Sequence, residues 1–291
     1  MQAGRWLEAA RPRTLPAAAS PVILGSGLAI GDDVFRWDAL LGALIGALAI
    51  QVAANFANDA SDAARGADSA DRIGPVRMVA TGEVSARQMW IATWMAVGVA
   101  VMAGIWLITI AGWVVALIGV LSIVAMLGYV GGPVPYGYRG LGEVFVFAFF
   151  GLVATVGSRY VHDMAAPMDA WLLGIPIGLL ATAILVANNY RDIETDERAG
   201  KRTLAVILGR RKTRYLYAMC TYLPYLLIAG FATLGWTPTA TLIAALVLPL
   251  AILANQRLAI ATTPPDLISI LALTSRLELV TSLSLAVGAA I

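Results

Sequence analysis

The stretch LLGALIGALAIQVAANFANDASDAARGADSADR, residues 40–72, decides how this chain is placed in its surroundings. Its first half is apolar apart from a single glutamine, and it is long enough to lie in a bilayer as a helix. Its second half carries four aspartates, at Asp59, Asp62, Asp68 and Asp71. The stretch therefore predicts a membrane helix that delivers a cluster of carboxylates to the boundary of the lipid.

The composition also indicates a membrane protein. Of the 291 residues, 59% are hydrophobic and 13% are charged, and the mean hydropathy is +0.79. A soluble domain carries roughly a quarter of charged residues, so this chain has too little charge to cover a water-facing surface. We predict an all-α, polytopic membrane protein, because lipid leaves no water to satisfy an open backbone. The single cysteine, Cys220, excludes an intrachain disulfide.

Apolar runs and basic residues together predict a topology. Nine runs are candidate spanning helices, at residues 15–30, 40–56, 88–110, 112–130, 141–160, 171–188, 215–234, 239–253 and 268–291. The connecting segments then alternate between the two sides of the membrane. Of the 20 Lys and Arg residues, 17 fall on the side of the N-terminus, whereas Arg36 and Arg159 fall on the other and Arg276 lies in the last run. By the positive-inside rule, we predict that the N-terminus and both acidic loops are cytoplasmic.

A second polar stretch, NNYRDIETDERAGKR, starts at Asn188 and also ends an apolar run. Asp192 and Asp196 follow Asn188 at intervals of four residues, which is the interval between Asn58 and Asp62. On a helix this spacing places the side chains on one face. Each of the two apolar helices is therefore expected to end in a polar stripe of amide and carboxylate groups.

The two stripes predict a metal site. Carboxylates on one face repel one another and resist ionisation near an apolar medium. Mg²⁺ removes both problems, because it prefers oxygen and binds through one or two carboxylates together with substrate phosphates. Arg72 and Arg77 follow the first stretch, and Lys201 and Arg202 follow the second. Cations beside such a cluster suit a diphosphate; the alternative is a solvated helix end with ordinary loop charges.

Three segments, NDASDAARGAD, NNYRDIETDERAGKRT and RPRTLPAAASPVILG, resemble the UbiA superfamily of intramembrane aromatic prenyltransferases. GPVRMVATGEVS and PYGYRGLGEVFVFAFFG are similar to its branch that prenylates 1,4-dihydroxy-2-naphthoate in menaquinone synthesis. The resemblance covers nearly the whole chain and implies helices around a central cavity. With the repeated Asn-x-x-x-Asp motif, we predict a single domain, 1–291, of two pseudo-repeated halves at roughly 1–135 and 136–291.

The resemblance also implies site residues, because the superfamily binds a prenyl diphosphate through Mg²⁺ on two Asp-rich motifs. The implied metal ligands are Asp59, Asp62, Asp68, Asp192 and Asp196, of which Asp62 and Asp192 are also catalytic. The third acid of the first motif falls on Gly66, so the ligand set of a second metal ion is open. The implied diphosphate contacts are Asn58, Arg72, Arg77, Asn188, Lys201 and Arg202. The two Asn residues fit capping or interhelical hydrogen bonds equally well.

The implied reaction transfers a polyprenyl group from prenyl diphosphate to 1,4-dihydroxy-2-naphthoate, with loss of CO₂ and diphosphate, and yields demethylmenaquinone. Mg²⁺ is the implied cofactor. The implied location is a bacterial cytoplasmic (inner) membrane, with the active site of this multi-pass protein facing the cytoplasm. The expected partners are polyprenyl diphosphate, the aromatic acceptor and membrane lipid. We expect no nucleic-acid partner and infer no required protein partner.

Other residues leave alternatives open. Tyr138 and Arg139 lie in a loop rich in Gly and Pro that either covers the site, with Tyr138 as a catalytic group and Arg139 near the acceptor, or forms a simple turn. Arg11 either binds the acceptor carboxylate or anchors the chain at the membrane surface. His162, the single histidine, is expected as a surface loop residue far from the acidic stretches. The run VFVFAFF is expected to face lipid or to pack against other helices.

Two rival functions remain at this stage. A sister prenyltransferase acting on 4-hydroxybenzoate or homogentisate would need nearly the same metal site, so only the acceptor separates it. A divalent-cation transporter would use the carboxylates as ion ligands. Ion sites of transporters usually lie near the midplane of the bilayer, whereas these aspartates lie at helix ends beside basic loops. This position favours the enzyme.

Overall fold

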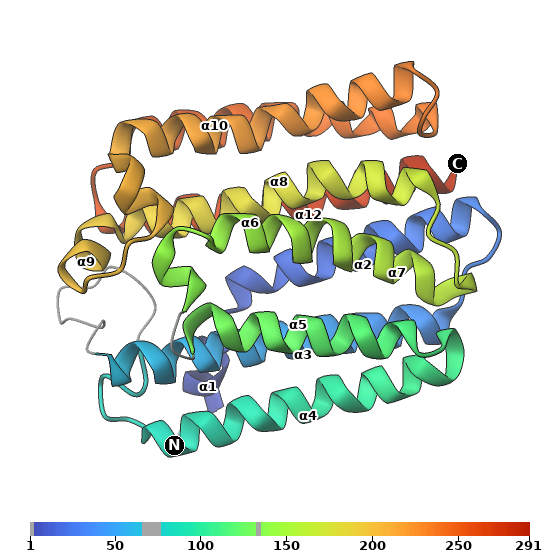
Figure 1. The fold of residues 1–291 in the computed structure, drawn as a ribbon. Coiled ribbons are helices and arrows are strands. Elements are labelled where there is room, and N and C mark those ends of the chain that lie inside the picture. The colour runs from blue at the N-terminus through green and yellow to red at the C-terminus, as the bar shows by residue number, and fades with distance from the viewer. Residues whose placement is uncertain (1–2, 66–76, 132–134) are drawn as a thin grey trace.

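The computed structural model describes residues 3–65, 77–131 and 135–291, and all regular structure within them is helical (Figure 1). The elements in chain order are α1 (Ala3–Ala9), η1 (Pro12–Thr14), α2 (Leu15–Gly31), α3 (Trp37–Ala64), α4 (Ala86–Ala111), α5 (Val114–Val130), η2 (Tyr136–Arg139), α6 (Gly142–Val146), η3 (Phe147–Val153), α7 (Ala154–Asp163), α8 (Met168–Arg191), α9 (Ile193–Arg198), α10 (Leu204–Thr233), η4 (Thr239–Val247), α11 (Leu248–Ile260) and α12 (Pro264–Ala290). The predicted all-α class is confirmed.

Eight described helical stretches are long and apolar enough to cross a membrane, and α5 is a shorter apolar helix of 17 residues. In this set α6, η3 and α7 form one continuous stretch, and η4 and α11 form another. The chain is therefore a multi-pass membrane protein, as predicted. The largest shift in a boundary concerns α10, which begins at Leu204 instead of residue 215 and is kinked at Gly209, where the backbone is not helical. Thr203 caps this end by accepting a hydrogen bond from the N–H of Val206. The first turns of α10 contain several basic residues, so this part of the helix was not recognised as an apolar run.

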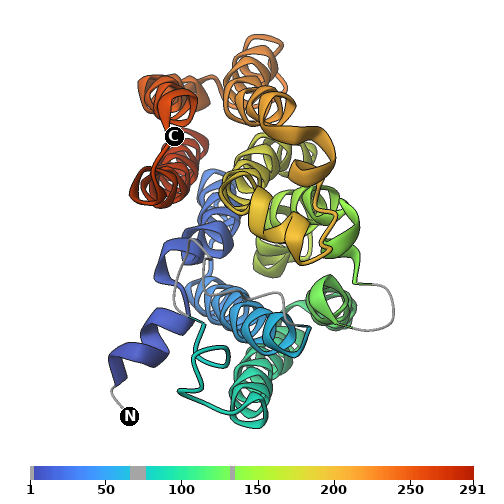
Figure 2. The same ribbon diagram turned by 90° about the vertical axis from the view of Figure 1, so that its left-hand side faces the viewer.

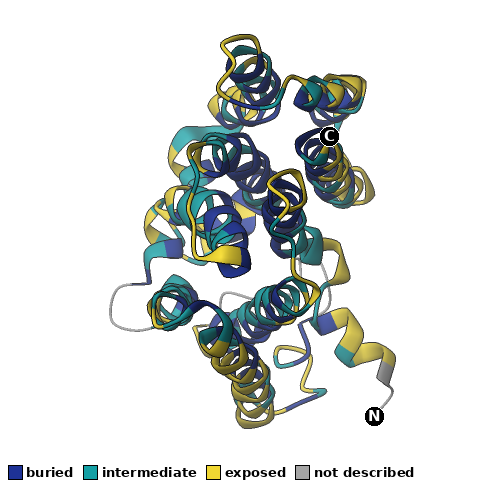
Figure 3. Ribbon diagram, turned by 90° about the vertical axis from the view of Figure 1, so that its right-hand side faces the viewer, coloured by how far each residue is buried: buried dark blue, intermediate teal, exposed yellow. Residues whose placement is uncertain are grey.

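The long helices lie side by side in one bundle, with α3 along α4, α2 along α12 and α8 along α10 (Figure 2). Small residues allow the closest approach: a Cβ on Gly27 would lie 2.5 Å from the Cα of Ala286, so α2 and α12 pack backbone to backbone. Buried residues lie between the helices, and exposed residues lie on the outward sides (Figure 3). Exposed side chains on α4 and α5 include Trp94, Met102 and Val124, which suits a surface covered by lipid.

His162 is buried, so the expectation of a surface loop residue was wrong. It lies in α7 and is 4% exposed. Its Nδ1 accepts a hydrogen bond from the N–H of Arg36 at 3.0 Å, its Nε2 lies 3.2 Å from Oγ of Ser26, and its ring stacks on Phe35. Helix α7 ends at Asp163, beyond the apolar run predicted at residues 141–160. Polar groups at the end of α7 form hydrogen bonds with polar groups of α2 and of the α2–α3 connection. His162 thus fastens the connection between α2 and α3.

Candidate functional site

The two acidic stretches meet at one end of the bundle. The first stretch ends α3, and the second spans the end of α8 and the short α9. The prediction that the second stripe lies on one continuous helix face was wrong, because the helix breaks at Asp192. Even so, Asp62, Asp192 and Asp196 line the same small polar pocket. The structure therefore brings residues of both stretches together in one pocket, and their function as one site stays a prediction.

Asp62 lies at the centre of this pocket and is 2% exposed. Its Oδ2 lies 2.8 Å from Nη2 of Arg77, and its Oδ1 lies 2.8 Å from Nζ of Lys201. Nζ of Lys201 is also 3.9 Å from Oδ1 of Asp196, so this lysine joins the two acidic stretches. Two cations lie against one buried carboxylate, and each opposite charge compensates for lost hydration.

Tyr138 donates a hydrogen bond from its hydroxyl to Oδ1 of Asp62 at 2.5 Å. Burial, and then the charge of Asp62, raises the pKa of Tyr138 well above its usual range, so the phenol stays protonated and remains a donor. Nζ of Lys201 lies 4.6 Å and Cζ of Arg65 lies 5.2 Å from the centre of its ring. The backbone of Tyr138 accepts a hydrogen bond from the N–H of Arg202. The loop that carries Tyr138 therefore forms hydrogen bonds with both acidic stretches.

Asp192 is held by its neighbour in sequence. Nε and Nη2 of Arg191 bind Oδ1 and Oδ2 of Asp192 at 2.7 and 2.6 Å, and Nη2 also donates to Oδ1 of Asn188 at 2.9 Å. Both members of this ion pair are buried. A two-pronged guanidinium contact fixes the direction of the carboxylate as well as its charge. Asn188 and Asp192, four residues apart in sequence, are thus oriented by one arginine.

The remaining predicted residues are distributed as follows. Asn58, Asn188, Arg11 and Arg77 line the polar pocket. Asp59 does not line it, and its carboxylate accepts hydrogen bonds from the N–H groups of Met78 and Val79 at 3.0 and 3.2 Å. Arg139 and Arg202 are exposed and lie outside the linings of the described cavities. Asp68 and Arg72 lie outside the described residues.

The described part of the chain contains no group of three or more Asp, Glu, His or Cys side chains close enough to form a metal cage by themselves. The pocket instead combines carboxylate and amide oxygens with Arg77 and Lys201. Hard oxygen donors suit Mg²⁺, which usually takes one or two carboxylates and completes its shell with water and phosphate. The donor set therefore fits Mg²⁺ that is bound together with a phosphorylated ligand.

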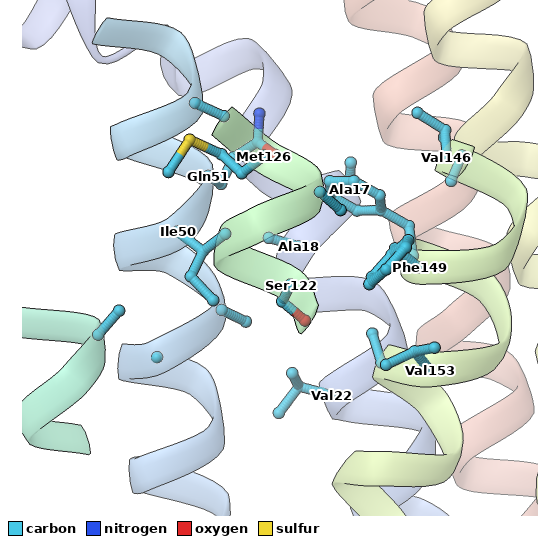
Figure 4. Close-up of a pocket in the computed structure, with 18 of the residues that line it drawn as sticks. Ala17, Ala18, Val22, Ile50, Gln51, Ser122, Met126, Val146, Phe149 and Val153 are labelled. Atoms are coloured by element: carbon cyan, nitrogen blue, oxygen red, sulfur yellow. The ribbon is translucent and has the colours of Figure 1, made fainter. Parts of the chain in front are cut away.

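A second, larger cavity of about 330 Å³ extends from this end into the apolar interior (Figure 4). Its wall comes from α2, α3, α5, η3 and neighbouring helices, with Val22, Ile50, Met126, Phe149 and Val153 among its side chains. On α5 the lining runs from Tyr129 to Val115, which corresponds to a depth of about 20 Å at the rise of a helix. Such a cavity suits a long hydrocarbon chain.

Four residues line both cavities, namely Arg11, Asn58, Tyr129 and Asn188. They mark the junction at which a polar head group and an apolar tail of one ligand would be joined. The junction continues as an aromatic series: the rings of Tyr129 and Tyr136 meet edge to face at 5.5 Å, and Tyr136 stacks on Phe145 at 3.9 Å. Electron-rich ring faces stabilise positive charge beside them.

Sequence reasoning missed this aromatic wall. Tyr129 received no role, and the run VFVFAFF was expected to face lipid or to pack, whereas Phe145, Phe149 and Phe150 line the large cavity. The segment winds as the π-helix η3, and a Cβ on Gly151 would lie 2.5 Å from the Cα of Gly178, so η3 fits tightly on α8. The available signal was the pair Phe145 and Phe149, four positions apart, followed by Gly151.

Comparisons with known proteins agree with this geometry. Residues 18–274 match the model of the UbiA prenyltransferase family. The chain is 42% identical over 214 residues to a Mycobacterium tuberculosis protein named 1,4-dihydroxy-2-naphthoate octaprenyltransferase, covering 73% of each chain. It is 38% identical over 243 residues to the Haemophilus influenzae protein of that name, covering 80% of this chain and 79% of the other.

Solved structures show the same fold. A UbiA homolog from Archaeoglobus fulgidus bound to GPP and Mg²⁺ superimposes with a TM-score of 0.68 at 14% identity, covering 97% of this chain and 99% of the other. The apo structure of a UbiA homolog from Aeropyrum pernix gives a TM-score of 0.68 at 15% identity, covering 94% and 96%. With the family model spanning most of the sequence, this chain belongs to the UbiA prenyltransferase family.

Proposed function

We propose that this prenyltransferase moves a polyprenyl group from its diphosphate to 1,4-dihydroxy-2-naphthoate, with loss of CO₂ and diphosphate, to give demethylmenaquinone in its reduced, quinol form. One observation carries the proposal: a polar pocket of carboxylates and cations opens into an apolar cavity through four shared residues. A prenyl diphosphate has this division of charge and hydrocarbon. The acceptor is suggested by the names of relatives that are 38–42% identical to this chain.

Mg²⁺ is the proposed cofactor, and the donors present fit it. Asp62, Asp192 and Asp196 would hold it, while Asp59 and Asp68 are the further ligands predicted from the sequence, and the ligand set of a second ion stays open. When bound, Mg²⁺ supplies Lewis-acid stabilisation of the negative charge that develops on the leaving diphosphate. The Archaeoglobus fulgidus homolog, which has the same fold, is bound to both Mg²⁺ and GPP, and this supports the proposal.

The basic residues of the polar pocket bind and orient the diphosphate in this proposal. Lys201 and Arg77 already lie within 2.8 Å of Asp62, so their charges are available to phosphate oxygens beside that carboxylate. Asn58 and Asn188 offer amide donors at the junction. Arg72 and Arg202 remain predicted contacts on the flanking segments. Fixed positive charges at the leaving group lower the barrier to breaking the allylic C–O bond.

The apolar cavity holds the first part of the prenyl chain and keeps water away from the allylic carbon. Tyr129 lies at the junction, so its ring is near the carbon that becomes positive. The ring carbon of the acceptor that bears the carboxylate forms the new C–C bond. The carboxylate leaves as CO₂ and its bonding electrons remain in the ring, so no proton acceptor is needed at that carbon.

Arg11 is the proposed contact for the carboxylate of the acceptor, because it lines both cavities. A guanidinium binds a carboxylate through two parallel hydrogen bonds. Tyr138 acts beside it as a catalytic group by donating to Asp62. Arg139 is the further acceptor contact predicted from the sequence, although its side chain is exposed.

The proposed location is a bacterial cytoplasmic membrane, with the N-terminus and the active site on the cytoplasmic side. The bias of 17 of 20 basic residues to one side supports this orientation. Polyprenyl diphosphate, the aromatic acceptor and membrane lipid are the proposed partners. Labelling of cysteines introduced at residues 36 and 198 in intact cells would check the orientation, with residue 36 reacting first.

The proposed function is tested by product formation in detergent. The purified protein receives 1,4-dihydroxy-2-naphthoate and a long prenyl diphosphate with Mg²⁺ or with EDTA, and products are read by mass spectrometry. We expect a Mg²⁺-dependent prenylated product that has lost CO₂. If a product forms only with 4-hydroxybenzoate or homogentisate, the proposed acceptor is overturned and the proposed metal site stands. No product with any acceptor, from folded protein, would overturn the proposed reaction.

A further inference from the structure

Asn55 is a buried residue of the first acidic stretch to which the proposed reaction assigns no role. It lies on α3 and is 3% exposed. Its Nδ2 donates hydrogen bonds to the carbonyl oxygen of Ala10 at 2.8 Å and to Oγ1 of Thr14 at 3.1 Å. A side-chain amide nitrogen carries two hydrogens. Both are therefore directed to the N-terminal segment and not to the cavity that Asn55 also lines.

Thr14 receives these contacts and passes them to the backbone. Its hydroxyl accepts hydrogen bonds from Asn55 and, at 3.3 Å, from Nε2 of Gln51, and donates one to the carbonyl oxygen of Arg11 at 3.0 Å. One donor and two acceptor positions are the full capacity of a hydroxyl group. The Asn55–Thr14 clamp, as we name these hydrogen bonds, thus holds η1 against α3.

Arg11 is the residue that the clamp holds. Its backbone is left-handed, with φ 52° and ψ 70°, a conformation that residues with a Cβ seldom adopt. Such a conformation persists only where surrounding contacts impose it, and here Thr14 binds the carbonyl group of Arg11 through both its N–H and its hydroxyl. This backbone conformation directs the side chain of Arg11 to the junction of the two cavities.

We infer that Asn55 is a positioning residue for the aromatic acceptor, which acts through Thr14 by holding Arg11 at the junction. The inference rests on the proposed function, because it takes Arg11 as the group that binds the acceptor carboxylate. Asn55 itself has only its amide oxygen left for a ligand, and an oxygen acceptor does not bind a carboxylate. Its effect on the acceptor is therefore exerted through Arg11.

Steady-state kinetics with each substrate varied in turn test the clamp. We expect Asn55→Ala and Thr14→Val to raise KM for the aromatic acceptor about tenfold, because each removes hydrogen bonds that fix Arg11. KM for the prenyl diphosphate should stay within about twofold in both variants. Thr14→Ser keeps the hydroxyl and should recover most of the loss seen in Thr14→Val. A larger change in KM for the prenyl diphosphate than for the acceptor would overturn the inference.

A double-mutant cycle separates action through Arg11 from a direct role. In the Arg11→Gln background, Asn55→Ala should change kcat/KM for the acceptor by less than about twofold, because the group it positions is gone. An undiminished tenfold loss in that background would show that Asn55 acts independently of Arg11 and would overturn the inference. If Asn55→Ala fails to fold, Thr14→Val compared with Thr14→Ser decides the question in the same background.

A matched control distinguishes loss of the clamp from general weakening of the bundle. Tyr225→Phe removes a buried hydrogen bond of 2.9 Å to Thr281, between α10 and α12 and away from both cavities. It should leave both KM values unchanged. The proposed function and this inference fail in different ways. If the unchanged protein prenylates no aromatic acceptor, the proposed function is overturned. If the clamp variants turn over normally and keep the same KM for the acceptor, only this inference is overturned.

Discussion

At the end of α3, Asp62 takes its described partners from distant parts of the chain, whereas at the end of α8, the described ion-pair partner of Asp192 is the next residue in sequence. Arg77 and Tyr138 bind Asp62 from 15 and 76 residues away. Arg191 binds Asp192 with both prongs of its guanidinium group. Two stretches that share a spacing of Asn and Asp are thus assembled differently. Among the described contacts, the pair at the second stretch is local, whereas those at the first stretch come from segments far along the chain.

The largest expected effect comes from Asp62→Asn. Removing this charge should lower prenyl transfer about a thousandfold or more, since a buried site for a developing anion loses a proposed metal ligand. Arg77 and Lys201 would then face a neutral amide in place of this carboxylate. Asp192→Asn should lower transfer to a similar degree. Single-turnover product formation measures both losses, and transfer by either variant at the unchanged rate with limiting Mg²⁺ would contradict the metal assignment.

Hydrogen exchange sharpens the comparison between these two variants. Asp62→Asn should increase exchange in three separated segments, around Arg77, Tyr138 and Lys201, because all three bind this one side chain. Among these segments, Asp192→Asn should increase exchange most near the junction of α8 and α9, where Arg191 binds this side chain. Equal patterns in the two variants would show that the acidic stretches are held in the same way.

A smaller effect is expected from Lys201→Met, which removes the cation that contacts both stretches. kcat/KM for the prenyl diphosphate should fall about a hundredfold, because a charge-assisted contact to the leaving group is lost. KM for the acceptor should change little. Lys201→Arg is the matched control and should retain part of the activity. An effect confined to the acceptor would exclude Lys201 as a diphosphate contact.

The sequence was sufficient to predict the part of this site that is encoded locally. Apolar runs of the length of a bilayer predicted the helices, and the interval of four residues predicted which amide and carboxylate groups would share a pocket. Asp62, Asp192 and Asp196 were predicted in this way because spacing along the chain is visible in one dimension, and Lys201 was predicted as a basic residue that follows the second stretch; their roles stay predictions. The division into halves 1–135 and 136–291 stays a prediction.

Residues whose role depends on packing could not be predicted from the sequence. Tyr129 lies at the junction because α5 lies beside α3. Phe149 lines the cavity because Gly151 allows η3 to pack closely against α8. His162 is buried because the connection between α2 and α3 folds over it. In each case the partner is far along the chain, and apolar periodicity does not tell a lipid-facing side chain from one that lines a cavity.

Tyr138→Phe should give a moderate loss of about tenfold in kcat. The ring remains beside Lys201 and Arg65, but the hydroxyl group no longer donates to Asp62. A hydrogen bond to a charged group contributes about 1.5–3 kcal/mol, and part of this is recovered by the two cations already on that carboxylate. Single-turnover kinetics at saturating substrates measure the loss. Unchanged kcat would assign the loop of Tyr138 to a structural turn, which was the alternative interpretation.

The smallest effect on transfer is expected from Asp59→Asn, which tests the neighbour that the sequence also predicted as a metal ligand. Both oxygens of Asp59 accept backbone N–H groups, from Met78 and Val79, and an asparagine can satisfy only one of them. We expect a loss of about 1–3 kcal/mol in the free energy of unfolding, with transfer at saturating Mg²⁺ within about threefold of the unchanged protein. Thermal unfolding and a Mg²⁺ titration of activity measure the two quantities. Should Asp59→Asn instead raise the Mg²⁺ requirement as strongly as Asp62→Asn, the first stretch would bind metal through both aspartates, and its docking on the segment after residue 77 would be coupled to the metal.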